Sequence, residues 1–140
     1  MNRFPKPLVL IDLGDTYQVN DPFVYESKLA GEITVPRGFP TDLASARVAW
    51  FALRGKVDHA AVIHDWLYAN GACSRVQADA IFREAMRAKN CGHWFTWTVW
   101  LAVRIGARKP WQNHRKGNTA GARFVRLQKG SDMSSLFNRP

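Results

Sequence analysis

Three side chains capable of acid–base chemistry lie on two neighbouring predicted helices. The helix predicted over residues 59–68 carries His64 and Tyr68, and the helix predicted over residues 75–90 carries Asp79. The i, i+3, i+4 spacing places these groups on the apolar face of each helix. His64 and Asp79 lie at nearly equal distances along the chain from the turn between the helices. We therefore expect their side chains to meet when the two helices pack antiparallel.

The chemistry of such a pair follows from burial. A buried aspartate needs a partner, because an unpaired buried charge is costly, and an imidazole N–H supplies one. The carboxylate of Asp79 would hold one tautomer of His64, so that the other ring nitrogen could take a proton from water or bind a metal. Tyr68 lies one turn beyond His64 and could hydrogen-bond Asp79. The predicted catalytic set is His64, Asp79 and Tyr68.

A second acidic group suggests a cation. Asp65 points to a different side of its helix, and Asp42 follows the turn at residues 38–40. Hard cations require several oxygen ligands, which Asp65, Asp42 and nearby backbone carbonyls could provide. This hypothesis predicts a divalent cation, calcium rather than zinc. The alternative is that Asp42 or Thr41 only caps a helix predicted over residues 43–53.

The same residues also fit a purely structural interpretation. A buried cluster of His64, Asp79 and Tyr68, joined by Arg75, could exist only to satisfy its own polar groups. We call this arrangement a polar lock. The residues alone leave the site and the polar lock equally open.

The elements that position these groups follow from residue periodicity. The first 40 residues alternate in the manner of short strands, which predicts a small N-terminal antiparallel sheet. A cluster of three to four helices follows, with the helical hairpin at its centre, and this order predicts an α+β fold. Ser74 and Gln77 form a capping box for the second hairpin helix, and Asp58 is placed to cap the first. The strands are predicted over residues 7–13, 16–19, 23–25 and 33–35, and the last helix over residues 93–105.

Charge divides the chain unevenly. The 140 residues contain 20 Lys and Arg against 11 Asp and Glu, a net charge of +9, and their apolar share of 46% excludes a disordered chain. Nine basic residues and one acid lie between Arg104 and the C-terminus. We predict one domain over residues 1–110 and a basic arm, rich in Gly, Asn and Ser, over residues 111–140. The arm could contact nucleic acid or an anionic membrane without sequence specificity, or remain solvated.

Other features limit the class of protein. Cys73 and Cys91 lack the spacing of a zinc pair or of a disulfide framework. No apolar run is long enough for a transmembrane helix, and the first residues do not form a signal peptide. The helix predicted over residues 93–105 carries aromatic residues almost all round, which indicates that it is buried or docked on another chain.

Three motifs carry a resemblance to a known family. They are Gly38–Ser45, Ala60–Tyr68 and Ser74–Phe82, in that order. Together they resemble the phage- and prophage-associated "domain of unknown function" family 1353, over about residues 38–104. The resemblance implies an origin in a tailed phage and a location in the virion or host cytoplasm. It implies no mechanism.

The hairpin is also similar to secreted phospholipases that use a His–Asp dyad and calcium. Their H-D-x-x-Y motif matches His64, Asp65 and Tyr68, and their A-D-x-x-F motif matches the sequence around Asp79. The similarity implies that His64 activates water, that Asp79 orients His64 and that Asp65 binds calcium. The chain lacks the glycine-rich calcium loop and the disulfides of those enzymes.

Two functions therefore remain as hypotheses. The first is a tailed-phage-encoded hydrolase with a His64–Asp79 centre, acting on a lipid ester or on cell-envelope material. The second is a structural or assembly component of the virion, associated with the tail or tail tip, in which the same residues form the polar lock. In the second, the basic arm and the aromatic helix would contact other phage proteins.

Overall fold

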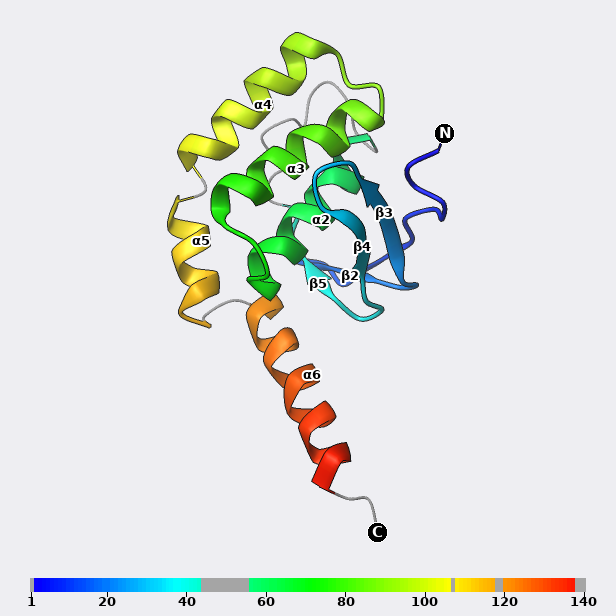
Figure 1. The fold of residues 1–140 in the computed structure, drawn as a ribbon, viewed down its shortest axis with the longest axis vertical. Helices are drawn as coiled ribbons and strands as arrows, with labels where there is room; N and C mark the ends of the chain where they lie inside the picture. The colour runs from blue at the N-terminus through cyan, green and yellow to red at the C-terminus, as the bar shows by residue number, and fades with distance from the viewer. Residues whose placement is uncertain (1, 44–55, 107, 118–119, 138–140) are drawn as a thin grey trace.

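The protein has an α+β fold, as the order of strands and helices predicts. A computed structural model describes residues 2–43, 56–106, 108–117 and 120–137 (Figure 1). Strands occupy the N-terminal part and helices the remainder. The helix predicted over residues 43–53 lies outside the described residues, apart from Leu43. Among the described residues, no helix has both the length and the apolar content needed to cross a bilayer.

The strands form two small sheets rather than the single sheet expected. Strands β1 (Leu10–Asp12), β2 (Tyr17–Val19) and β5 (Pro40–Thr41) pair antiparallel in the order β1-β2-β5. Strands β3 (Phe23–Ser27) and β4 (Gly31–Val35) form a separate hairpin.

The tight turn explains why β3 pairs with β4. The hydroxyl of Ser27 accepts hydrogen bonds from the backbone N–H groups of Leu29 and Ala30, and Gly31 has a φ of 76° that suits glycine. The residues from 38 to 40 were expected to form a turn. Instead, Pro40 and Thr41 add a strand beside β2, where Gln18 pairs with Pro40.

The helical hairpin consists of α2 (Lys56–Asn70) and α3 (Arg75–Ala88). Helix α2 begins before its predicted start, so Asp58 lies in its first turn and does not cap it. The predicted capping box is present: the hydroxyl of Ser74 accepts from the N–H of Gln77 at 3.2 Å, and the side chain of Gln77 accepts from the N–H of Ser74 at 2.9 Å. Helix α3 therefore begins where the motif predicts.

Helix α2 lies at the centre of the molecule (Figure 1). It contacts α3, α5, α6 and β4. Five consecutive residues, from Ala60 to His64, are buried, which is possible only for a helix surrounded on most sides. The two alanines allow close approach of neighbouring elements, while the larger aliphatic side chains fill the core. Any group on α2 is therefore held by its surroundings.

The C-terminal residues, which the sequence predicts as a basic arm, are largely helical. Helices α4 (His93–Gly106), α5 (Arg108–Arg115) and α6 (Ala120–Phe137) bring the described helices to five. The ring of Trp111 packs edge-on against Tyr68, and Phe124 packs against Phe39. These tertiary contacts hold α5 and α6 against the body of the protein. The later part of α6 extends away from the body (Figure 1).

Candidate functional site

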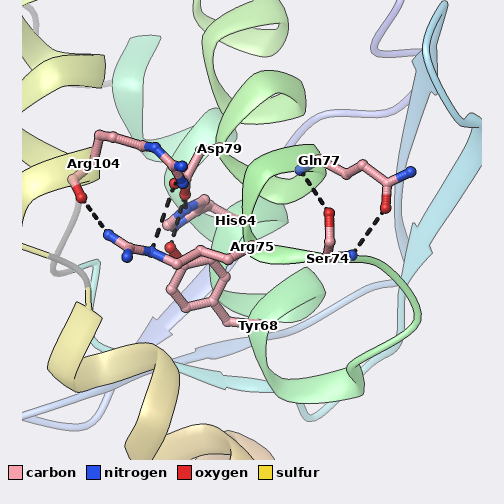
Figure 2. Close-up of polar contacts among 7 residues, drawn as sticks. All are labelled: His64, Tyr68, Ser74, Arg75, Gln77, Asp79 and Arg104. Carbon is pink, nitrogen blue, oxygen red and sulfur yellow. Dashed lines mark hydrogen bonds and ion pairs between the residues drawn. The ribbon is translucent and has the colours of Figure 1, made fainter.

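The predicted contact between His64 and Asp79 is present at the centre of the helical hairpin. Nε2 of His64 lies 2.8 Å from Oδ1 of Asp79. The hydroxyl of Tyr68 donates to the same Oδ1 at 2.7 Å, one turn farther along α2 (Figure 2). One carboxylate oxygen thus joins the three residues predicted as a catalytic set, whose catalytic role stays a prediction.

Two arginines complete the surroundings of Asp79. Nη1 of Arg104, from α4, donates to Oδ2 at 3.1 Å, and Nε of Arg75 lies 3.8 Å from the same oxygen. The guanidinium of Arg75 also donates to the backbone carbonyl of Arg104, which ties α3 to α4 (Figure 2). Arg75 was expected in the cluster, whereas Arg104 was assigned to the basic C-terminal region. One signal could have identified Arg104: it is the only charged residue of α4.

Burial sets the ionisation of the pair. The side chains of His64 and Asp79 are 2% and 1% exposed. Burial lowers the pKa of His64, although the bond to Asp79 opposes this shift, so the imidazole is neutral at pH 7. Burial alone would raise the pKa of Asp79, but hydrogen bonds from His64 and Tyr68 lower it overall, and the group stays ionised. A neutral imidazole facing a carboxylate carries its proton on Nε2, which makes Nδ1 the basic nitrogen.

Aromatic rings cover the imidazole on several sides. The ring centres of Tyr68 and His64 are 4.1 Å apart, and those of Phe82 and His64 are 4.9 Å apart. Burial and the hydrogen bond to Asp79 raise the pKa of Tyr68, so its hydroxyl remains a donor. The rings and the hydrogen bonds together fix the orientation of the imidazole.

Asp65 faces a different part of the molecule, as its position on the helix predicts. Its carboxylate accepts a hydrogen bond from the hydroxyl of Thr41, which in turn accepts from the backbone N–H of Leu43 at 3.2 Å. Burial, together with the negative charge of Asp42, raises the pKa of Asp65 to about 7. Leu43 has a φ of 53°, an uncommon conformation for leucine. The two carboxylates predicted as cation ligands thus influence each other electrostatically.

The described residues contain no group of three or more His, Cys, Asp or Glu side chains arranged for a metal ion. The cation therefore stays a prediction that rests on Asp65, Asp42 and backbone oxygens. The role of Asp42 or Thr41 as a cap concerns a helix that lies outside the described residues.

Comparisons with known proteins bear on the family. A family model described as "Protein of unknown function (DUF1353)" matches residues 17–103. The matched range extends from β2 into α4 and contains His64, Tyr68 and Asp79. No curated protein and no solved structure matches the chain.

Proposed function

This chain belongs to the DUF1353 family, and we propose that it is a hydrolase of tailed-phage origin in which His64 acts as general base and Asp79 positions it. The observation that carries the proposal is the sharing of Asp79 Oδ1 by His64 Nε2 and the Tyr68 hydroxyl. This contact directs Nδ1 away from the carboxylate as the proton acceptor. Asp79 and Tyr68 are positioning residues in this proposal.

The similarity to the His–Asp phospholipases supports the same assignment. In the H-D-x-x-Y motif, the histidine and tyrosine are four residues apart on one helix face. Here that spacing delivers both His64 and Tyr68 to the one carboxylate of α3. The lowered pKa of His64 keeps its imidazole in the form that accepts a proton at pH 7.

The proposed reaction is the hydrolysis of an ester, with a lipid ester or cell-envelope material as substrate. Nδ1 of His64 takes a proton from water while the water oxygen bonds to the carbonyl carbon. The bond to the alkoxide then breaks, and the alkoxide takes the proton from His64. The products are a carboxylic acid and an alcohol, and Asp79 balances the positive charge that His64 carries between the two steps.

The proposal includes a divalent cation near Asp65, for which the donors are suitable in kind. Two carboxylates lie close enough for the charge of Asp42 to raise the pKa of Asp65, and a cation would relieve that repulsion. Asp65 and Asp42 would hold it, with calcium favoured by the all-oxygen donors. When bound, such an ion would neutralise the two carboxylates on the side of α2 that carries Asp65.

Hydrolysis requires that water and an ester reach His64. The side chain of His64 is 2% exposed, so the segments that cover it must separate before water and an ester reach Nδ1. The rings of Tyr68 and Phe82 contact the imidazole directly, and Trp111 of α5 packs against Tyr68.

His64→Gln tests the proposal. The Gln amide can still donate to Asp79, so the fold is preserved, but it has no basic nitrogen. We expect loss of ester hydrolysis by about 100-fold or more. The matched control is His59→Gln, because His59 packs against Phe4 and Phe23, away from Asp79. Circular dichroism would verify folding. The proposal is wrong if the parent protein cleaves no ester, phospholipid or peptidoglycan with calcium present, or if the His64 variant retains the parent rate.

A second candidate function is a structural or assembly component of a phage tail. The near-complete burial of both His64 and Asp79 favours it, because a polar lock needs no access to solvent. Mass spectrometry of purified particles tests this candidate. Absence of the protein from the particle would count against it, whereas a stoichiometric presence together with an inert His64 site would support it.

A further inference from the structure

The outward face of α4 is apolar, unlike that of an ordinary surface helix. Thr96, Val99 and Val103 are buried on the side that faces the rest of the protein. Trp94, Leu101 and Ile105 lie on the opposite side, where they are 86%, 52% and 74% exposed. In a surface helix of a soluble protein, polar residues normally occupy this side.

These side chains form a stripe, in which exposed Thr98 lies between Trp94 and Leu101 and donates its hydroxyl to the backbone carbonyl of Trp94. Steps of seven and four residues separate Trp94, Leu101 and Ile105, which keeps them within a narrow arc of the helix. Trp97 borders the arc and is also exposed. The stripe is about 16 Å long, because each helical residue advances the axis by about 1.5 Å. We call these four residues the α4 stripe.

The surroundings of the α4 stripe are basic. The guanidinium of Arg83 lies 4.6 Å from the ring centre of Trp97, and Arg87 contacts His93 at the start of α4. Helix α4 contains no acidic residue, and the net charge of the whole chain is +9. A partner for this face must therefore tolerate apolar contact and carry negative charge.

We propose that the α4 stripe binds the surface of an anionic lipid bilayer. Tryptophan and aliphatic side chains beside cations match the boundary between acyl chains and anionic headgroups. Four side chains are too few for a stable protein interface, which buries about 1,200–2,000 Å². The favoured occupant is therefore lipid, and a protein partner becomes an outcome of the test.

The α4 stripe also has a connection to the candidate site. Arg104 lies on the same helix and donates to Asp79 at 3.1 Å. In Figure 1, α4 runs along the outside of the helical layer, next to α3, which carries Asp79. A helix bound at a lipid surface would thus place the His64–Asp79 centre near assembled anionic phospholipid as substrate. This assignment of substrate rests on the proposed function, whereas binding of the bilayer does not.

Vesicle flotation tests the binding. The full chain is mixed with vesicles of phosphatidylcholine alone or with added phosphatidylglycerol. We expect flotation with the anionic vesicles, and binding about tenfold weaker with the neutral ones or in high salt. The double variant Leu101→Glu/Ile105→Glu should bind the anionic vesicles at least about tenfold more weakly. The matched control is Leu29→Glu, which changes a residue that is 63% exposed in the β3–β4 turn and should leave binding unchanged.

The same variants separate this proposal from the proposed hydrolase. The double variant should hydrolyse a soluble short-chain ester at the parent rate, because its changes are on the exposed face. His64→Gln should bind vesicles normally and hydrolyse the ester about 100-fold more slowly or worse. Equal flotation of the parent and the double variant would overturn the membrane proposal. The membrane proposal would also be overturned if the parent protein did not bind anionic vesicles. If the double variant then failed to join phage particles, the α4 stripe would be a protein interface.

Discussion

Helix α3 carries two carboxylates that gather donors, and their surroundings differ. The carboxylate of Asp79 accepts hydrogen bonds from His64, Tyr68 and Arg104, and its side chain is 1% exposed. Glu84, on the same helix, accepts from Arg3 at 2.6 Å and from the hydroxyl of Ser27 at 2.6 Å, and is 14% exposed. It also accepts from the backbone N–H of Lys28 at 2.8 Å. Hydrogen bonds lower the pKa of both carboxylates despite their burial.

The comparison teaches what separates a structural contact from a candidate site. Glu84 joins the β3–β4 turn and the N-terminal segment to α3, and it accepts from a guanidinium, a hydroxyl and a backbone N–H, none of which can act as a base at pH 7. Asp79 instead faces the imidazole of His64, a type of side chain that can act as a base near pH 7. Both carboxylates stabilise the fold, but only Asp79 could also position a base.

The largest expected difference concerns stability. Asp79→Ala should lower the free energy of unfolding by about 3 kcal/mol, because it leaves buried donors on His64 and Tyr68 without a partner. Glu84→Ala should lower it by about 1–2 kcal/mol, because water can reach its donors. Urea unfolding followed by circular dichroism measures both. A larger loss for the Glu84 variant would contradict this ranking.

The next largest effect concerns the pH dependence of stability, which should differ between the His64–Asp79 pair and Glu84. The folded protein lowers the pKa of His64 below 6.5, so the unfolded chain binds this proton more readily, and the contribution of His64 to stability falls as the pH drops below about 6.5. The slope cannot exceed about 1.4 kcal/mol per pH unit for one proton. The stability that Glu84 contributes is present above pH 4.5 and is lost below it.

Unfolding measured between pH 7 and pH 4 checks this order. In His64→Gln, the loss between pH 6.5 and pH 5 should be smaller than in the parent, while the loss below pH 4.5 should remain. Identical profiles for the two proteins would show that His64 contributes no pH dependence.

A smaller effect concerns Asp65. Its pKa of about 7 in the folded protein lies above the ordinary value of 3.8, so stability is lost as the pH rises through 7. We compare the free energy of unfolding of Asp65→Asn with that of the parent, in the presence of a chelator. The difference should shift in favour of the variant by about 1–2 kcal/mol when the pH is raised from 5 to 8. Thermal unfolding at both pH values measures it. If added calcium stabilises the parent at pH 8 but not the variant, the cation proposal gains support.

The smallest effect concerns the N-terminus of α3, the helix that carries both Asp79 and Glu84. Gln77→Ala removes one half of the capping box and should lower the free energy of unfolding by about 0.5–1 kcal/mol. Since it touches neither Asp79 nor Glu84, hydrolysis and the pH profile should be unchanged. A change in either would mean that the cap acts on the site.

Local patterns predicted the hairpin correctly. The capping box set the start of α3, and helical spacing brought His64, Tyr68 and Asp79 onto facing sides. Each of these inferences depends on residues close in sequence, where helical geometry fixes which side chains are neighbours.

Local patterns are least informative where contacts join distant parts of the chain. Trp111 packs against Tyr68 and Phe124 packs against Phe39, and no local pattern predicts which distant residues meet. The division of the strands into two sheets also followed from pairing rather than from strand propensity.

The amino-acid sequence by itself determined the α+β order, the helical hairpin and the meeting of an imidazole with a carboxylate, because short-range periodicity and capping decide these features. Only the tertiary structure decided that Arg104 joins Asp79, that the His64–Asp79 pair is nearly sealed from solvent, and that α4 turns an apolar stripe outward. Burial is a property of all neighbouring elements together, and it sets both the pKa of a group and its access to a reactant.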